Sequence, residues 1–450
     1  MPYPTAAPAA DRPSTSPHLE LRNRLDSLAR AHRVPGAQLA VHTGTHLLSV
    51  HTGTADALTG SPFTAETAVP LGSVTKVATA AALLLLADDG DLDLDEPVVE
   101  LLPVFSDVPE VTVRHLLSHT AGLPTGPDSD SAAGATVSRY LSAVCTARNA
   151  LFPPGSGFSY SNAGYVAAGR VLSEVTGMTW QEALGAMLLE PLGIVPAFLG
   201  DTTSARPVAT GHALNTATGL VRPAHQNLAP VEAPAGALLA SAEDLVALGR
   251  AVVGRSAVLP ATVADLMRRP EPAADPGALA DSWGLGLALF RQDGRMWCGH
   301  DGNAQGTSCH LRADPDSGVV VAFTGNAGAA TALWRDLTAE LARLTGIRVP
   351  ATPAADVHRG PAVPLPDCAG TYRNGSTEYA VKLDGDGKPT LSVDGDYPIP
   401  LLCHADLSYD LVDPATGRVE PGGRFHRDPA TGAIDRLQIS GRTARRTGSV

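Results

Sequence analysis

The chain has 450 residues, which is long enough for two domains. Hydrophobic residues make up 44% of it and charged residues 18%, which supplies ample apolar material for packed cores. The net charge of -13 excludes a general binder of nucleic acid or of anionic membranes, because phosphate groups require clustered positive charge.

The first 18 residues, MPYPTAAPAADRPSTSPH, are rich in proline, alanine and serine, and we expect a flexible tail over 1–18. They lack the basic segment and apolar run of a secretory signal. The longest apolar run, 80–87, is too short for a membrane span. The five cysteines are widely spaced and predict neither a zinc ribbon nor a disulfide scaffold. We therefore expect a cytoplasmic protein with reduced cysteines that binds neither membrane nor nucleic acid.

Three elements are predicted after the tail. Leucines at helical spacing indicate a helix over 19–32, and alternating β-branched residues with glycine turns indicate a β-hairpin over 36–55. Residues 74–89 form a predicted helix that is small or apolar on nearly every face, and Gly90 is placed to end it. Such a helix is expected to be buried at the centre of the domain.

The rest of the first domain alternates between helical and extended patterns. Further helices are expected at 113–118, 163–176, 180–189, 242–253, 261–267 and 329–344. Strands are expected at 286–291, 296–299, 307–313 and 318–325. Early strands, a helical middle and late strands require the two ends to share one sheet. The predicted fold class is therefore α/β (α+β), with helices on an antiparallel sheet over 19–347.

The sequence changes character near its C-terminal end. Residues 348–366 are rich in proline and alanine without apolar periodicity, and they are expected to form a linker. Residues 367–450 contain short alternating segments divided by Asp and Gly turns, which predicts a small all-β domain, a barrel or a sandwich. Tyr372-Arg373-Asn374 is interpreted as a turn at the start of this domain.

A candidate nucleophile lies at the start of the buried helix, in Ser73-Val74-Thr75-Lys76 after a turn at Gly72. A spacing of three residues places Ser73 Oγ and Lys76 Nζ on one face, within reach of a hydrogen bond. Burial disfavours the ammonium form, so Lys76 becomes the neutral base that a serine nucleophile needs. A Ser-x-x-Lys match often arises by chance. Here, however, the chain has only three lysines, and this one lies in its most apolar helix, where an unpaired charge is costly.

Two further motifs carry side chains suited to the same chemistry. Tyr160 and Asn162, in PPGSGFSYSNAGY, precede a predicted helix on a loop, where the phenol can relay a proton with Lys76 and the amide can orient the lysine or hold a substrate amide. His300 and Gly302, in CGHDGNAQGTS, lie at a predicted strand edge where backbone can approach a substrate. The N–H groups of Ser73 and Asn303 are then the expected oxyanion donors.

The order Ser-x-x-Lys, Tyr-x-Asn, His-x-Gly resembles that of the serine penicillin-recognising family, which includes class C β-lactamases, DD-peptidases, esterases and D-aminopeptidases. The resemblance extends over about residues 20–345, through segments such as VPGAQLAV, VRHLLSHTAGLP and APAGALLASAEDLVALGR. It implies the β-lactamase/transpeptidase-like fold, with Ser73 as the acylated nucleophile, Lys76 and Tyr160 as base and proton relay, Asn162 as substrate orienter and His300 on the strand beside the site. Gly302 and Asn303 are implied substrate-binding residues.

One departure from the family pattern narrows the expected activity. His300 stands where many β-lactamases carry lysine, which favours peptidase or esterase chemistry over β-lactamase activity. His115 and His119, in the LLSHTAGL segment, are interpreted as structural. We expect no cofactor and no metal. The Asp384–Gly387 run lacks the spacing of a calcium loop and is interpreted as a tight turn.

Family members with a C-terminal lipocalin-like β-domain and no export signal include D-aminopeptidases, esterases and penicillin-binding-protein-type thioesterases. The last group macrocyclises non-ribosomal peptides whose thioester ends in a D-residue, and we expect this activity here. The expected partner is a peptidyl thioester or ester delivered by a carrier protein of a peptide synthetase. A D-stereospecific hydrolase is the alternative, and a non-catalytic ligand-binding protein is a third hypothesis.

The C-terminal GRTARR contains Arg442, Arg445 and Arg446. These cations either project into the mouth of the site or form a solvated basic tail. The solvated tail is the favoured interpretation.

Overall fold

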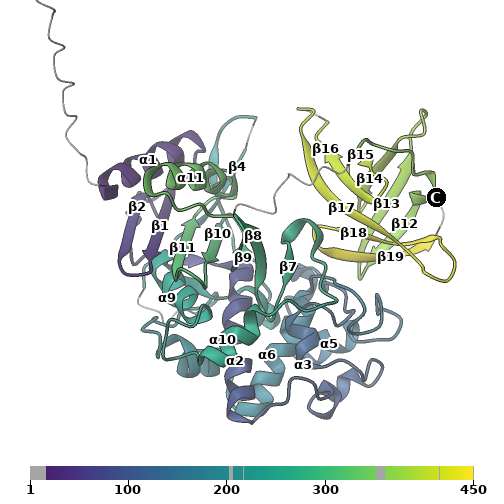
Figure 1. Cartoon of the computed structure of the whole chain (residues 1–450), viewed down its shortest axis with the longest axis horizontal. Helices are drawn as coiled ribbons and strands as arrows, with labels where there is room; N and C mark the ends of the chain where they lie inside the picture. The colour runs from purple at the N-terminus through teal and green to yellow at the C-terminus, as the bar shows by residue number, and fades with distance from the viewer. Residues whose placement is uncertain (1–16, 202–205, 216, 351–359, 415, 449–450) are drawn as a thin grey trace, which may run out of the picture.

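The computed structural model describes residues 17–201, 206–215, 217–350, 360–414 and 416–448. Most of the expected tail, at 1–16, and the middle of the expected linker, at 351–359, lie outside the described residues. The described part forms an α/β body and a smaller β-barrel beside it (Figure 1). No helix in these ranges is long and apolar enough to cross a membrane.

The α/β body is built on one antiparallel sheet of seven strands in the order β2-β1-β11-β10-β9-β8-β7. The N-terminal hairpin pairs with the last strand of the sheet, with Leu39 opposite Phe323. The two ends of this region therefore share one sheet, which confirms the expected fold class. The strands are β1 (Gly36–Thr43), β2 (Leu47–Gly53), β7 (Ser282–Trp283), β8 (Ala288–Gln292), β9 (Arg295–Gly302), β10 (Ser308–Ala313) and β11 (Val319–Gly325).

Two helical layers cover the two faces of this sheet. Helices α1 (Pro17–Ala31) and α11 (Ala330–Thr345) pack together on one face (Figure 1). Alternate residues of β1 point to opposite faces, so Leu39 joins the core beneath α1 and α11 while Ala40 joins the core of the other layer. That other layer contains the buried helix that follows Ser73.

The other layer holds the remaining helices of the body. They are α2 (Thr75–Asp89), α3 (Val113–Leu117), α4 (Ser129–Ala132), α5 (Val137–Val144), α6 (Asn162–Thr176), α7 (Trp180–Leu184), α8 (Ala233–Gly236), α9 (Ala242–Val252) and α10 (Ala261–Arg268). Helix α2 is central, and Gly90 ends it in the left-handed conformation, at φ 82°, as predicted. The sequence pattern did not predict α5, and the helix predicted over 180–189 changes into a π-helical turn, η4 (Gly185–Leu189).

Two short pairings were also not predicted, β3 (Val69–Pro70) with β6 (Leu239–Ala240) and β4 (Gly211–Leu214) with β5 (Val221–Ala224). The first pairing ends immediately before the turn that carries Ser73. It joins the approach to α2 to the segment that follows α8.

The C-terminal region is a closed barrel in which each strand pairs with the next and the last pairs with the first. Its strands are β12 (Gly370–Asn374), β13 (Thr377–Leu383), β14 (Pro389–Val393), β15 (Ile399–Cys403), β16 (Ser408–Val412), β17 (Val419–Arg427), β18 (Ile434–Ile439) and β19 (Arg442–Gly448). Tyr372, Leu391, Tyr409 and Phe425 belong to its buried core. The inward-facing side chains therefore pack against one another, as in other small barrels.

The turn predicted at Tyr372-Arg373-Asn374 is wrong, because these residues form the end of strand β12. The turn begins only at Asn374, which pairs with Thr377 across a two-residue hairpin loop. Tyr372 is buried in the barrel core and Arg373 is exposed, so the alternation of a strand, not a turn, explains the sequence here.

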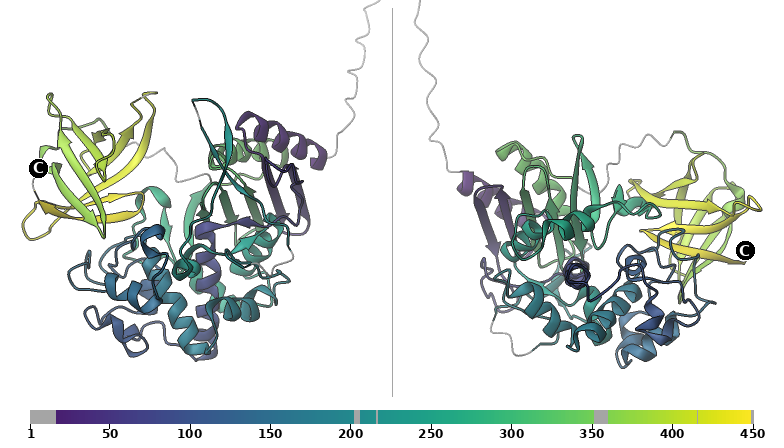
Figure 2. Two further views of the ribbon diagram at one scale, coloured as in Figure 1. Left: turned by 180° about the vertical axis from the view of Figure 1, so that it is seen from behind. Right: turned by 60° about the horizontal axis from the view of Figure 1, so that its bottom comes forward.

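The barrel packs directly on the segment of the α/β body that precedes α6 (Figure 2). The Tyr160 N–H donates to the Gly441 carbonyl over 2.8 Å, and the Thr443 hydroxyl donates to the Phe158 carbonyl over 2.8 Å. The start of β19 therefore runs along the chain immediately before Tyr160. Through these contacts the second domain borders the candidate site.

Candidate active site

Ser73 and Lys76 are in hydrogen-bond contact at the start of α2. The one-turn element η1 (Gly72–Val74) leads into this helix, and Lys76 Nζ lies 3.2 Å from Ser73 Oγ. The amine also donates to the Ala235 carbonyl over 2.8 Å. Lys76 is fully buried. In the described structure its polar contacts are the Ser73 hydroxyl and the Ala235 carbonyl, and no carboxylate forms an ion pair with it there.

The pKa of Lys76 is well below its ordinary value. Burial is the main cause, and the positive charge of Arg442 adds to it, while the carboxylate of Glu232 acts in the opposite direction. The lowered pKa increases the share of Lys76 that holds a neutral amine at a given pH. Such an amine can accept the proton of the Ser73 hydroxyl.

Tyr160 lies beside this pair. Lys76 Nζ is 5.0 Å from the centre of its ring, and the Tyr160 hydroxyl is buried close to that of Ser73. Burial raises the pKa of Tyr160, against the opposing effects of the Ser73 hydroxyl and the Arg442 charge. The phenol therefore stays protonated near neutral pH. The roles of base for the amine and proton relay for the phenol stay predictions.

Local capping explains the positions of Tyr160 and Asn162. Ser161 is the N-cap of α6, and its hydroxyl accepts a hydrogen bond from the Gly164 N–H over 3.0 Å. Tyr160 therefore precedes the helix, and Asn162 occupies its first position. The Asn162 side-chain oxygen is buried without a partner among the described residues, and Asn162 and Ser73 line the same pocket.

His300 approaches Tyr160 from strand β9, with 6.1 Å between the ring centres. Its Nδ1 lies 2.6 Å from the Asp301 carbonyl oxygen, and its Nε2 is buried without a partner among the described residues. Burial, reinforced by the charge of Lys76, lowers the pKa of His300 to about 4. The imidazole is therefore neutral at pH 7, with Nδ1 as its donor and Nε2 left as an acceptor.

A buried ionic network lies behind His300. The Asp301 carboxylate accepts hydrogen bonds from His310 Nδ1 at 2.7 Å and from Arg312 at 2.7 and 3.0 Å. Burial alone raises the pKa of Asp301, but the charges of Arg312 and His310 overcome it and hold the carboxyl ionised. Arg312 also stacks over the Phe290 ring at 3.9 Å. This network fixes the peptide that carries His300.

Gly302 and Gly72 permit a close approach between β9 and the turn that carries Ser73. A Cβ atom on Gly302 would lie 2.0 Å from the Leu71 carbonyl oxygen. Gly72 has a φ of +54°, and a Cβ there would lie 2.3 Å from the Asn303 carbonyl oxygen. Ser73 and Asn303 consequently border one pocket of about 300 Å³. Their pairing as oxyanion donors stays a prediction.

His119 was interpreted as structural, and the structure places it against the site. Its ring centre is 4.3 Å from that of Tyr160, and its Nδ1 accepts a hydrogen bond from the Ser161 N–H over 3.1 Å. Burial, with the charges of Lys76, His300 and Arg442, keeps its pKa well below the ordinary value. His119 has a φ of 59°, a strained conformation that the sequence alone does not reveal.

Trp283 completes the aromatic surroundings of the site. Its ring centre is 5.8 Å from Tyr160, 5.4 Å from His119 and 5.3 Å from His300. It lies on β7, an edge strand too short to be recognised from periodicity. Its apolar faces help to exclude water from the polar groups of the site.

Arg442 is a barrel residue that lies beside the site. Its guanidinium lies 5.4 Å from the centre of the Tyr160 ring, on the first residue of β19. Arg445, on the same strand, donates to the Ala150 carbonyl over 2.8 Å, and Arg446 donates to the Asp367 carbonyl over 3.0 Å. The favoured interpretation of GRTARR as a solvated tail is therefore wrong, because barrel closure makes it a paired strand.

Comparison with known proteins gives matches along most of the chain. The Beta-lactamase family model matches residues 21–343. Penicillin-binding protein 4 of Amycolatopsis lactamdurans is 34% identical over 376 residues, which covers 79% of this chain and 97% of that protein.

Two solved structures are similar in fold. SurE is 38% identical with a TM-score of 0.84, over 96% of this chain and 99% of SurE, and it has also been solved with D-Leu. The D-amino acid amidase from Ochrobactrum anthropi, complexed with D-phenylalanine, is 25% identical with a TM-score of 0.62, over 73% of this chain and 98% of the amidase.

Proposed function

The chain belongs to the β-lactamase and penicillin-binding-protein family of serine hydrolases, and from this premise we propose that it is a peptide macrocyclase. Ser73 takes the acyl group of a peptidyl thioester or ester. The free amine at the other end of the same peptide then releases it as a ring. The residue at the acyl end has the D configuration.

The observation that carries the first half of this proposal is the contact between Ser73 Oγ and the buried Lys76 amine at 3.2 Å. In the acylation step, neutral Lys76 accepts the hydroxyl proton while Oγ attacks the acyl carbonyl. The N–H groups of Ser73 and Asn303 hold the oxyanion. When the intermediate collapses, the leaving thiol or alcohol takes the proton through Tyr160.

The second step reverses the proton movements with a different nucleophile. The peptide's own amine attacks the ester on Ser73 and gives a proton to neutral Lys76. The bond between the acyl carbon and Oγ breaks as the amide bond forms, and Oγ recovers that proton from the lysine. The unpartnered Asn162 side-chain oxygen is suited to bind an amide N–H of the substrate, and neutral His300 offers Nε2 as an acceptor beside Tyr160.

Two findings support a D-residue at the acyl end. SurE, which is similar to this chain over both domains, has been solved with D-Leu. The similar amidase is a D-amino acid amidase and has been solved with both D-phenylalanine and L-phenylalanine. Its support for a D-residue therefore comes from its stated activity and not from the ligands bound to it.

The barrel supports cyclisation over hydrolysis. In this chain the barrel hydrogen-bonds to Tyr160 and places Arg442 over its ring. The described lining of the Ser73 pocket contains no barrel residue, so the proposed role of the barrel comes from its position beside Tyr160. In this proposal it limits water access and confines the acyl chain, which raises the effective concentration of the peptide's amine.

Hydrolysis to the linear acid is the second candidate function, and the likeness to the D-amino acid amidase favours it. It shares the acylation step and differs only in the group that attacks the acyl-enzyme.

The proposal is tested with a linear peptidyl thioester that has a free N-terminal amine and a D-residue at the thioester end. Its products are identified by mass spectrometry, with Ser73→Ala as the control. We expect cyclic peptide as the main product, lost in the variant. Linear acid formed through Ser73 would replace the macrocyclase by the hydrolase. Loading the same peptide on a carrier protein of a peptide synthetase tests the proposed delivery, which should raise kcat/KM.

A further inference from the structure

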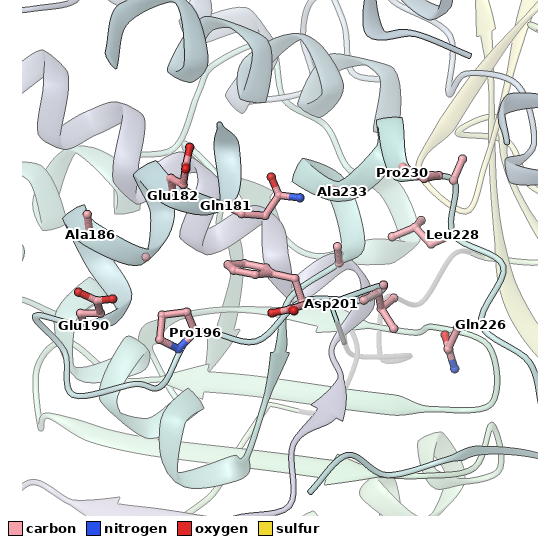
Figure 3. Close-up of a pocket in the computed structure, with 16 residues that line it drawn as sticks. Gln181, Glu182, Ala186, Glu190, Pro196, Asp201, Gln226, Leu228, Pro230 and Ala233 are labelled. Carbon is pink, nitrogen blue, oxygen red and sulfur yellow. The ribbon is translucent and has the colours of Figure 1, made fainter. Parts of the chain in front are cut away.

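A second pocket, larger than the one that holds Ser73, lies next to it. Its volume is about 810 Å³, within the range of pockets that bind drug-sized ligands. Figure 3 shows Glu182, Ala186 and Glu190 on the helical wall and Leu228 and Pro230 on the opposite wall. The pocket is therefore a depression between α7–η4 and the chain that leads into α8.

The two pockets share three residues, Leu199, Gln226 and Leu228. Leu199 and Leu228 are half-buried, and a Cβ atom on Gly236 would lie 3.5 Å from the Leu228 side chain. The boundary between the pockets thus includes two leucine side chains. The shared residues show that the two pockets adjoin one another.

The lining of the larger pocket is mainly apolar, and its charged groups have one sign. Phe198, Leu199 and Leu228 contribute the largest apolar side chains. Glu182, Glu190 and Asp201 also line it, and none of the described lining residues is lysine, arginine or histidine. Apolar side chains gain from burial there, whereas a carboxylate meets like charges.

The π-helical turn η4 shapes this wall. The sequence predicts a regular helix over 180–189, but from Gly185 to Leu189 the helix is wider. Gly185 and Ala186, two small residues of this turn, line the pocket. Turns of this kind occur often at functional sites, because they change the direction of side chains within a helix.

We propose that the larger pocket binds the part of the acyl chain that lies several residues from the carbonyl on Ser73, and that it selects apolar side chains and rejects acidic ones. This inference rests on the proposed function, since it assumes that Ser73 carries a peptide. It assigns the segments 181–190 and 226–230 to substrate selection, separate from the residues that perform the chemistry.

The test fills the pocket with Ala186→Trp, at an exposed position where the larger side chain meets little steric resistance. Two thioesters with the same D-residue at the acyl end are compared, one with a single acylated residue and one with four further apolar residues. The ratio of kcat/KM, long over short, should fall about tenfold or more, the size of effect that a hydrophobic pocket exerts. Ala339→Trp, at an exposed position on α11, is the matched control and should leave the ratio unchanged.

A second variant tests the charge selection. With wild-type protein, a long thioester carrying glutamate in place of a distal apolar residue should have a kcat/KM lower by about tenfold. Glu190→Gln, at an exposed position, should reduce this penalty. An unchanged long-to-short ratio in Ala186→Trp, with an unchanged glutamate penalty in Glu190→Gln, would overturn the inference and leave the proposed function standing. Absence of acylation by the short thioester in wild-type protein would overturn both.

Discussion

The α/β body and the barrel contribute to the site in different ways. The body supplies Ser73, which is half-buried, and Lys76 and Tyr160, which are buried. All three are positioned by α2 and the approach to α6. The barrel supplies Arg442, half-exposed, and hydrogen bonds to the segment before Tyr160. The groups proposed for bond making thus belong to the rigid core of one domain. The second domain contributes the positive charge of Arg442, which lowers the pKa of Lys76, and packs against the chain around Tyr160.

The largest expected effect comes from the body. Ser73→Ala removes the nucleophile and leaves the other site groups in place, so turnover should fall by about 10⁴-fold or more. Intact-protein mass spectrometry after incubation with the thioester should show no covalent adduct. Normal turnover by folded Ser73→Ala protein would refute the assignment.

Tyr160→Phe ranks next, because it removes the relay hydroxyl and keeps the ring that packs against His119. Loss of a positioned proton donor costs about 10²- to 10³-fold, and kcat should fall by that amount. Rapid-quench measurement of acylation locates the loss in the first step. An unchanged rate would remove Tyr160 from the proton relay.

A smaller effect should follow from the barrel. The charge of Arg442 lowers the pKa of Lys76, so acylation, which needs the neutral amine, falls as pH drops through that value. Arg442→Met removes the charge and raises the pKa, and the acid limb of the pH–rate profile should move to higher pH. A shift of about half a unit corresponds to about 0.7 kcal/mol, typical for a partly exposed charge.

Arg445→Met is the matched control for that variant. It lies on the same strand, but its guanidinium binds the Ala150 carbonyl and does not contact the Tyr160 ring. Its pH profile should coincide with that of the wild type. Equal shifts in the two variants would mean that net charge, and not the position of Arg442, sets the profile.

The smallest expected effect on turnover comes from a hydrogen-bonded contact between the two domains. Asn374 in the barrel accepts a hydrogen bond from the Thr125 N–H over 2.8 Å and donates to the Thr443 carbonyl over 2.7 Å. Asn374→Ala leaves these buried groups unpaired, which should lower the free energy of unfolding by about 1–3 kcal/mol. Thermal unfolding measures it, with the exposed Asn23→Ala as control. Equal melting temperatures for the two variants would contradict this role for Asn374.

Local sequence signals predicted the larger part of the fold. Helical spacing and the Gly90 stop located α2, and alternation located β8 to β11, because each depends on residues close together in the chain. The same holds for the pair Ser73 and Lys76, whose contact follows from one turn of helix.

The features that the sequence did not predict arise from contacts between distant segments. Arg442 reaches Tyr160 only because the barrel closes and then packs on the body, and nothing in GRTARR indicates that contact. His119 follows the five-residue helix α3, and Trp283 lies on the two-residue strand β7. Both residues join the site only through tertiary packing. The larger pocket is lined in part by a π-helical turn, and no residue pattern in 180–189 predicts that turn.

The central claim is that a peptide is held covalently on Ser73 before it leaves. It is tested most directly by rapid acid quench of the protein with the linear peptidyl thioester, followed by intact-mass measurement and mapping of the modified peptide. The account predicts an adduct of the mass of the acyl chain on Ser73, which disappears as cyclic peptide accumulates. An adduct on another residue, or cyclic product formed at full rate by the Ser73→Ala variant, would contradict it.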